Sequence, residues 1–576
     1  MKPIIEKELY KIADILLSYR TTGENLSYWE GLEMTDGKFG YPLIYSTWNG
    51  TSGIIIFFLA LYRYKKEREF LHVAEDAAKS LVELSQTHPP EYHNLYSGSG
   101  SMIYMLLDVY ETTQNDYYLD QAVNLAVLYD QPLRNTVEYD LLCGTAGVLL
   151  VLTKLYHYSQ DARIMESIHF LINKLVLNAR PSQQGFSWGE NTISMDGLCG
   201  FSHGASGIAY VLMQVGNYFH DEELIWLAEQ GLLYEMQYYV PEKASWMDLR
   251  TPTSGIDPNT PNIMNWDKAL FTQYSNDYNT WAHGAVGCAI SRLYAYEITG
   301  KEIYRSLVDA VIQRCIYDVD NHQKKNFILF SGYGGIADIL LYAGRVLQRQ
   351  DLETVITTIA KRTINRDHRQ WGVNKKNDMG LLTGSSGIGY MYLQILQNTA
   401  SSDYSKQQDS ILYPRLPENS SQKTFHVKEL LFKRFFPGHP FPVENAWDVF
   451  PSTIDGDNIS NDKFSLLRNS KGKLSFNTRI SILEQRLKEY DDARLCELSL
   501  TLTPFVKITY SADNWYILYC VNDRIHQFDM SPGMHLLIQE LLSGKSINNI
   551  ESTDKQGLLI AVRMMLSRFI LMEKTA

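Results

Sequence analysis

Three side chains that could carry acid–base chemistry lie in short glycine-rich turns. His203 stands in the stretch GFSHGASGIAY, Asp140 in YDLLCGTAG and His283 in WAHGAVG. Histidine suits proton transfer because its pKa lies close to neutral pH. Asp140 could orient or charge-stabilise His203, or it could cap its own helix, as an aspartate before a helix often does. His203 could equally hold neighbouring loops together through a hydrogen bond.

These turns belong to a unit that recurs seven times along the chain. Each copy has Gly-x-x-Gly, or a close variant, followed at once by an apolar helix. The copies begin at Gly50, Gly98, Gly144, Gly204, Gly284, Gly332 and Gly384. The second copy has Ser101 in place of its second glycine. Successive copies start 46 to 80 residues apart, which is enough for two helices and two turns.

Amphipathic segments alternate with the glycine-led helices. Residues 67–84 and 118–128 place polar side chains on one face and apolar side chains on the other, whereas the glycine-led helices are apolar all round. The sequence therefore predicts a mainly α protein, a seven-repeat α/α toroid with the glycine turns at one end. The glycines would allow close approach and positive φ at crowded turns. The helix N-termini are expected to direct unpaired N–H groups and the positive ends of their dipoles into a shared cavity.

Five of the turns, taken together, resemble those of a known family. Besides the three turns above, they include LFSGYGG and GLLTGSSGIGY. The set resembles the lanthionine cyclase family, and is closest to the cyclase domains of multifunctional lanthipeptide synthetases. The likeness covers about residues 30–400. It implies an enzyme that adds cysteine thiols of a precursor peptide to dehydroalanine or dehydrobutyrine, which closes thioether rings.

In zinc-dependent members of that family, two cysteines and one histidine hold a Zn²⁺ that binds the thiol and lowers its pKa. At the corresponding positions this sequence has Ala282 in place of the first cysteine, and Phe330 and Ser331 in place of the Cys-His pair. Alanine and phenylalanine cannot bind a metal, and a serine hydroxyl is a poor zinc ligand. The resemblance therefore leads us to expect neither a metal nor another cofactor.

The resemblance also implies roles for residues that remain. The acid/base histidine of the family corresponds to His203 and its aspartate to Asp140, while His283 occupies a variable position beside the lost ligand. We expect His203 to protonate the enolate that forms when a thiol adds to a dehydroamino acid. A rearranged metal site built from Cys199, His203 and His283 is the alternative, although no compact ligand spacing supports it.

Composition narrows the class of protein. The 576 residues include 53 Lys and Arg against 65 Asp and Glu, a formal net charge of −12, which argues against a nucleic-acid partner. The N-terminus lacks the pattern of a signal peptide. The most apolar stretch, residues 53–62, is too short to span a bilayer. The six cysteines are scattered without a Cys-x-x-Cys pair, as in proteins with reduced thiols. We expect a cytoplasmic protein.

The chain changes character after the repeats. We expect the toroid to cover residues 1–397, and the polar stretch 398–423 to be a linker. Residues 424–504 remain unassigned, although they contain a helical start and a charged helix around residues 480–493. The last part, residues 505–576, reads as a small α+β domain.

That last domain alternates at strand period, with turns near residues 511–514 and 522–523. Helices are predicted at residues 532–542 and 558–572. This order resembles the winged-helix domains by which peptide-modifying enzymes bind a leader peptide as an added strand. A DNA-binding winged helix is disfavoured because a dense basic recognition helix is absent from residues 505–576.

The leading hypothesis is a lanthipeptide maturation protein that closes rings without zinc. Its partners would be a ribosomally made precursor peptide and a separate dehydratase, since nothing in the sequence resembles a dehydratase or a kinase. Two alternatives remain open. One is a catalytically silent scaffold that binds the precursor or the dehydratase. The other is a glycan-processing toroid, which would need paired carboxylates in its cavity, whereas only Asp140 and Asp338 lie close to the glycine turns.

Overall fold

The structure is a computed structural model. It describes residues 1–24, 26–189, 197–250, 278–324, 326–364, 366–367, 371, 377–400, 410–441, 457–469, 487–488, 490–521, 524–568 and 570–574. The chain divides into two compact units. The first unit consists of Met1–Val176, Cys199–Met247 and Asp277–Val427, and the second of Leu177–Leu198, Asp248–Asn276 and Lys428–Ala576. The candidate site residues His203, Asp140 and His283 all lie in the first unit.

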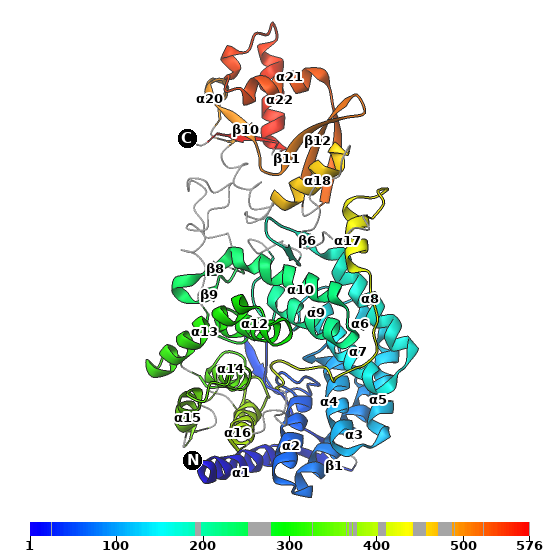
Figure 1. Ribbon diagram of the computed structural model, residues 1–576, viewed down its shortest axis with the longest axis vertical. Helices are drawn as coiled ribbons and strands as arrows, with labels where there is room; N and C mark the ends of the chain where they lie inside the picture. Colours follow the sequence, from blue (N-terminus) through cyan, green and yellow to red (C-terminus); the bar gives the residue numbers. More distant parts are fainter. Residues whose placement is uncertain are drawn as a thin grey trace. The chain divides into compact units, whose positions relative to one another are not determined.

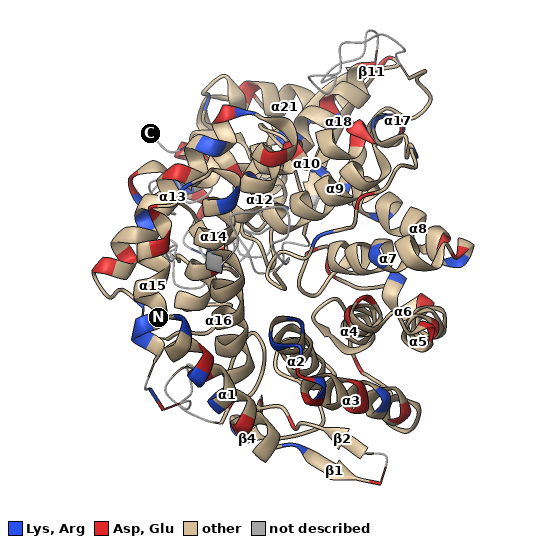
Figure 2. Ribbon diagram, turned by 60° about the horizontal axis from the view of Figure 1, so that its bottom comes forward, with Lys and Arg blue, Asp and Glu red and all other residues tan. Residues whose placement is uncertain are grey.

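The first unit is a closed ring of seven glycine-led helices (Figures 1 and 2). These inner helices are α2 (Thr51–Lys65), α4 (Gly98–Thr113), α7 (Thr145–Ser159), α9 (Ala205–Phe219), α12 (Ala285–Thr299), α14 (Tyr333–Val346) and α16 (Ser385–Ala400). Each contacts the next, and α16 contacts α2, which closes the ring. Their all-apolar sequences follow from this position, because each helix is covered by neighbours on both sides.

A second layer of helices surrounds the inner ring. The outer helices are α1 (Lys2–Ser18), α3 (Arg68–Thr87), α5 (Asp116–Leu128), α8 (Ala162–Asn178), α10 (Glu222–Glu235), α13 (Glu302–Asp320) and α15 (Leu352–Thr363). The N-terminal helix α1 packs on α16 and so completes the seventh pair. Figure 2 shows charged residues on α3, α13 and α15 and none on α9 or α16. The predicted toroid is confirmed.

The glycines serve close approach more than unusual backbone angles. A Cβ on Gly207 would lie 2.0 Å from the carbonyl oxygen of Phe201, so no side chain fits where this helix leaves its turn. Among the first glycines of the seven repeats, only Gly98 and Gly284 have positive φ, of 66° and 79°. Gly204, by contrast, is extended, with φ −126° and ψ −173°. The expectation of positive φ therefore fails at most of the turns.

Several of the expected unpaired helix N–H groups are hydrogen-bonded within the turns themselves. The turn before each helix folds back so that its carbonyls accept from the first helical amides. Thr145 donates to Glu138 at 3.0 Å, and Gly287 donates to Thr280 at 3.0 Å. The prediction that free N–H groups face a shared cavity is wrong there, because the local turn satisfies them first.

Residues 410–423, predicted to belong to a flexible linker, pack against the ring instead. Ser410, Ile411, Leu412 and Tyr413 are at most 5% exposed, and Lys423 donates its backbone N–H to Phe219 at 2.9 Å. The polar composition of this stretch suggested a linker, but its few apolar residues are buried against the ring. We name residues 410–417 the axial segment. The other part of the predicted linker, residues 401–409, lies outside the described residues.

One inner-helix carboxyl facing the axial segment makes stability depend on pH. Burial raises the pKa of Asp338 to about 7, although a hydrogen bond to Ser410 and the charge of Arg345 oppose the rise. An unfolded Asp338 ionises near pH 4 while the folded one stays protonated, so stability should fall between about pH 4 and pH 7. Asp338→Asn should remove up to about 4 kcal/mol of this loss. Thermal unfolding at pH 5 and pH 8 should show the variant gaining on the parent at pH 8. Parallel pH dependences would contradict this assignment.

The second unit contains a three-stranded antiparallel sheet of β11 (Val506–Ser511), β12 (Asn514–Val521) and β13 (Arg524–Met530), in that order. The predicted turn near residues 511–514 is confirmed, and the turn at residues 522–523 lies outside the described residues. Helix α21 (Pro532–Leu542) has the predicted bounds. Helix α18 (Asn458–Asn469) packs against β11, where Lys507 forms an ion pair with Asp462 at 2.5 Å.

The end of the chain differs from its prediction. Helix α22 covers Lys555–Ser567, and the apolar residues after it form β14 (Leu571–Glu573) rather than more helix. Strand β14 pairs with β10 (Leu500–Leu502), which buries Leu571 completely. Helix α20 (Asp492–Glu497) contributes Leu495 to the same core. The C-terminal fold therefore begins before residue 505. The charged helix expected around residues 480–493 lies mostly outside the described residues.

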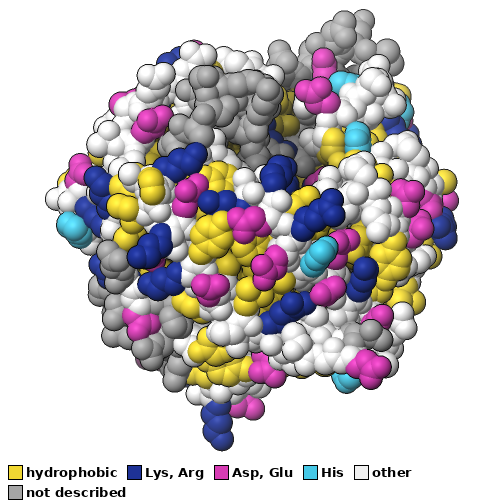
Figure 3. All heavy atoms as spheres, turned by 90° about the horizontal axis from the view of Figure 1, so that it is seen from below, with side chains coloured by type: hydrophobic (Ala, Val, Ile, Leu, Met, Phe, Trp, Pro, Cys, Tyr) yellow, Lys and Arg dark blue, Asp and Glu magenta, His cyan; other side chains and the backbone are white. Residues whose placement is uncertain are grey.

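Figure 3 shows Lys and Arg interspersed with Asp and Glu over the face in view, rather than gathered into one basic patch. Among the described helices, none combines the length and the apolar character that a membrane crossing requires.

Candidate functional site

The glycine turns are joined to one another by their main chains. The N–H group two residues before the first glycine of one turn donates to the carbonyl of the equivalent residue in the next turn. These bonds run from Leu142 to Ser202 (3.0 Å), Ser202 to Ala282 (3.2 Å), Ala282 to Phe330 (3.3 Å), Phe330 to Leu382 (3.3 Å), Leu382 to Trp48 (2.9 Å) and Trp48 to Tyr96 (3.3 Å). We name this set of bonds the turn ring. It fixes the relative positions of side chains that lie far apart in the sequence.

The turn ring brings His203 and Asp140 into direct contact. His203 Nδ1 lies 2.8 Å from Asp140 Oδ2, and the side chains are 29% and 6% exposed. The other oxygen, Oδ1, accepts the backbone N–H of Cys143 at 2.7 Å. Asp140 thus orients His203 and fastens its own turn, but it does not cap α7, whose N-cap is Gly144 and which has no side-chain capping bond. Because the carboxylate holds Nδ1, the other ring nitrogen, Nε2, is the one that can face a substrate.

A second histidine lies against the first. The rings of His203 and His283 are stacked, with centroids 5.7 Å apart and planes 17° from parallel. Thr280 Oγ1 accepts the backbone N–H of His283 at 3.1 Å and holds that turn in place. The two imidazoles therefore lie next to each other on neighbouring turns of the ring.

A buried ion pair supports the turn that carries His203, and sequence reasoning missed it. Glu235, from α10, accepts the backbone N–H groups of Gly200 and Ser206 at 3.0 and 2.9 Å. Arg292, from α12, pairs with Glu235 at 2.6 Å, and both side chains are fully buried. Arg292 in the apolar helix α12 was the available signal, since a charged residue is rarely buried unless it is paired. Its partner could not be read from the sequence.

The positions that correspond to the zinc ligands hold an apolar cluster instead. The ring of Phe330 packs on Trp48, with centroids 4.7 Å apart, and Ala282 is 6% exposed. Ser331 Oγ is buried without a hydrogen-bond partner among the described residues. An aromatic contact and one hydroxyl do not make a donor set for zinc. The residues present do not fit the metal of the zinc-dependent members.

A different trio of potential ligands does meet in the structure. One donor atom each from Asp140, Cys143 and His203 lies within 4.8 Å of the others. The sequence analysis missed Cys143, although it stands three residues after Asp140. As the trio stands, Asp140 and His203 bond directly, and burial together with Asp140 and Glu138 raises the pKa of the Cys143 thiol to about 12. The thiol is therefore protonated at neutral pH, which disfavours metal binding.

Cys199 of the alternative metal site, and Cys288 on the nearby helix α12, are packed in the interior. Cys199 and Cys288 are buried, 4% and 0% exposed, and burial raises the pKa of the Cys288 thiol. Neither joins His203 and His283 in a metal-binding group of the described residues. Trp281, expected in a cavity wall or in the core, is fully buried.

We expect the purified protein to carry no stoichiometric zinc, because the ligand positions hold Ala282, Phe330 and Ser331. Elemental analysis after dialysis without chelator measures it directly. About one equivalent of zinc retained by the parent and lost from Cys143→Ser would contradict the expectation and assign the metal to the trio of Asp140, Cys143 and His203.

Comparisons with known proteins agree with this architecture. The family described as lanthionine synthetase C-like protein matches residues 41–411. The solved structure of nisin cyclase is similar with a TM-score of 0.51 and 15% identity, over 68% of this chain and 94% of that one. A cellobiose 2-epimerase from Bacillus thermoamylovorans B4167 has a TM-score of 0.33 and 16% identity, over 56% and 89% of the two chains. No curated protein sequence matches the chain.

The family match covers all seven inner helices, from before α2 into the axial segment, but not α1, and the likeness to nisin cyclase shows the same fold. The repeats that predicted the toroid are therefore those of a known family. The chain belongs to the lanthionine synthetase C-like family.

Proposed function

We propose that the protein closes thioether rings in a dehydrated precursor peptide without using zinc. The observation that carries the proposal is the retained His203–Asp140 pair beside a ligand site that has become apolar. A protein kept only for its fold has no need of a partly exposed histidine held by a buried carboxylate. The same pair is what proton transfer at the α-carbon requires.

The reaction moves two protons: the attacking thiol loses one, and the α-carbon of the dehydroamino acid gains one. The cysteine sulfur bonds to the β-carbon of the dehydroamino acid, and the carbon–carbon π electrons move to the α-carbon and its carbonyl as an enolate. The enolate then takes a proton at the α-carbon from His203 Nε2. We propose that His283, whose ring stacks on that of His203, accepts the proton of the attacking thiol. One neutral and one protonated imidazole are the forms needed for the base and the acid.

The C-terminal unit has a strand edge to which a leader peptide could bind. Within the described part of this unit, β13 pairs on one side only, with β12. Its Phe528 is 54% exposed, and its ring stacks against His526. An extended peptide could add to this edge as a further strand. We propose that the leader binds here, and that a separate dehydratase supplies the dehydroamino acids.

A time course in chelated buffer tests the proposed activity. The protein is incubated with a dehydrated precursor, and alkylation of the remaining thiols is scored by mass spectrometry, beside the spontaneous reaction. We expect thiols to disappear faster with the protein, and added zinc to make no difference. If the protein binds the precursor but leaves the spontaneous rate unchanged, the scaffold function replaces the enzymatic one.

A further inference from the structure

The axial segment is held by its main chain, from several directions. Four of its carbonyls accept side-chain hydrogen bonds. The carbonyl of Ile411 accepts from Tyr96 Oη (2.9 Å), and that of Leu412 accepts from Trp281 Nε1 (2.7 Å). The carbonyls of Tyr413 and Pro414 both accept from Tyr210 Oη (3.0 Å each). Two of its N–H groups donate as well: that of Ile411 to Tyr390 Oη (3.2 Å) and that of Leu416 to Gln214 Oε1 (3.1 Å). Bonds of this kind bind a backbone rather than a particular sequence.

Side chains of the axial segment add three specific contacts. Arg415 forms two hydrogen bonds to Glu297, of 2.9 and 2.6 Å. The ring of Tyr413 stacks on Tyr342, with centroids 4.6 Å apart. Ser410, at the start of the segment, bonds the buried carboxyl of Asp338. The segment is therefore seated in one register.

All seven inner helices, or the turns that lead into them, surround the axial segment. The hydrogen-bonding partners above come from α9, α12, α14 and α16 and from the turns before α4 and α12. The other side is a cavity of 290 Å³ that residues of α2, α4 and α7 line together with Ile411, Arg415, Leu416 and Pro417. The segment therefore lies in the bore of the ring.

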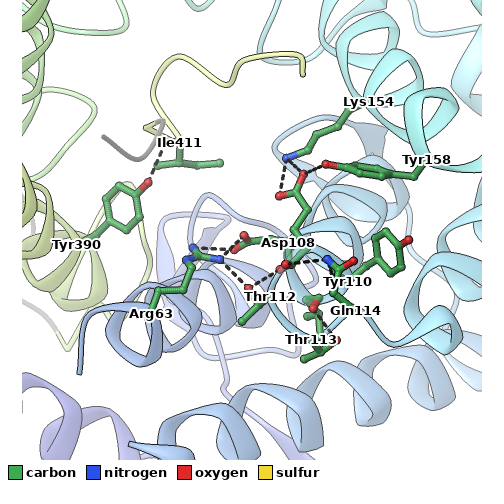
Figure 4. Close-up of polar contacts among 12 residues, drawn as sticks. Arg63, Asp108, Tyr110, Thr112, Thr113, Gln114, Lys154, Tyr158, Tyr390 and Ile411 are labelled. Carbon is green, nitrogen blue, oxygen red and sulfur yellow. Dashed lines mark hydrogen bonds and ion pairs between the residues drawn. The ribbon is translucent and has the colours of Figure 1, made fainter. Parts of the chain in front are cut away.

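Two ion pairs line the cavity beside the axial segment (Figure 4). Arg63 pairs with Asp108 at 2.6 Å, and Lys154 pairs with Glu111 at 2.9 Å. Figure 4 shows Ile411, bonded to Tyr390, facing these pairs across the cavity. Its volume is at the lower end of the roughly 300–1,000 Å³ typical of small-molecule sites. A polypeptide with its side chains does not fit through it.

Removing the axial segment would leave buried hydrogen-bond donors without acceptors. Tyr96, Tyr210 and Trp281 are fully buried, and each gives its side-chain donor to the segment. A buried donor without an acceptor costs more than its hydrogen bond is worth in the folded state. The segment is thus a fixed part of the ring rather than an occupant that readily exchanges.

We propose that residues 410–417 permanently close the bore of the ring and form the inner wall of the reaction site. Trp281, which donates to Leu412, directly precedes Ala282 at the vacated ligand position. The site is then blind on this side, so a substrate peptide reaches His203 only from the glycine-turn end. The protein would accept the reacting residues as a loop and would not thread a free peptide end through the ring.

Hydrogen–deuterium exchange on the full chain tests the seating directly, by mass spectrometry of proteolytic peptides. Amides of residues 411–416 should exchange as slowly as those of α9, at least about 10³-fold slower than an unstructured peptide, since both need the ring to open. Tyr210→Phe removes the donor to two carbonyls and should speed exchange of these amides by 10-fold or more. Tyr118→Phe, which loses a buried hydroxyl bond to Glu75 in the outer layer, should leave it unchanged. Exchange of residues 411–416 within seconds in the parent would overturn the proposal.

A precursor blocked at both ends tests how the substrate peptide reaches His203. This experiment rests on the proposed ring-closing function. A dehydrated core peptide fused between two folded domains should be cyclised within about twofold of the rate of a peptide fused at one end only. Closure of the singly fused peptide with failure of the doubly fused one would mean that a free end must thread, and would overturn the proposal. If no peptide is cyclised, the proposed function fails, while the exchange measurement still decides whether the bore is closed.

Discussion

His203→Asn is expected to slow ring closure by about 10²–10⁴-fold, the usual contribution of a general acid or base. Asparagine can keep a hydrogen bond to Asp140, so the turn should stay in place while the proton donor is lost. The rate of thiol loss with a dehydrated precursor measures the effect. Thermal unfolding of the variant should differ little from that of the parent, because the His203 side chain is partly exposed.

Two further variants separate chemistry from structure. Asp140→Asn should lower the rate less than His203→Asn, because His203 remains but loses the carboxylate that fixes its ring. His72→Asn, in the exposed face of α3, is the matched control and should close rings at the parental rate. A parental rate in His203→Asn would refute the assigned role of this turn.

A chain that ends at residue 427 is expected to fold as a ring but to bind the precursor on the order of 10²-fold more weakly, since the leader no longer raises the local concentration of the core peptide. The boundary follows from the packing. Phe425 donates its backbone N–H to Asp221 at 2.7 Å, and its ring contacts Phe219, so a cut after Ser421 would remove part of the ring unit. Circular dichroism checks the fold, and titration with the leader peptide and the whole precursor checks binding.

Full-length variants test the same idea without truncation. Phe528→Ala, on β13, should weaken leader binding. Tyr510→Ala, which removes an aromatic ring that is 46% exposed on β11, should not. Equal affinity of the truncated and full-length proteins for the leader would show that the leader docks on the ring.

The ring was predictable because its signal is repeated. Seven glycine-led apolar segments can be buried only if each packs between two others, and α2 to α16 begin where the glycines indicated. The resemblance pointed to His203 and Asp140, which meet at 2.8 Å. In that contact the sequence supplied the residue types, and the fold supplied the distance.

The rest depended on contacts between segments far apart in the chain. A polar, serine-rich stretch gives no sign that Leu412 will bond Trp281, 131 residues earlier. Likewise, Glu235 reads as one more charged residue of an outer helix until the turn of His203 folds onto it. The strand β14 was missed because its pairing with β10 outweighs the helical pattern of the apolar residues that precede Glu573.

The central claim is that a fixed proton donor, His203, completes ring closure inside this protein. Spontaneous addition protonates the enolate from either face, whereas a donor held by Asp140 reaches only one face. The most direct test is therefore the configuration at the α-carbon of the new thioether residues, determined by hydrolysis and chiral chromatography of the product. We predict one configuration with the protein in chelated buffer. The same mixture as in the spontaneous reaction would contradict the account.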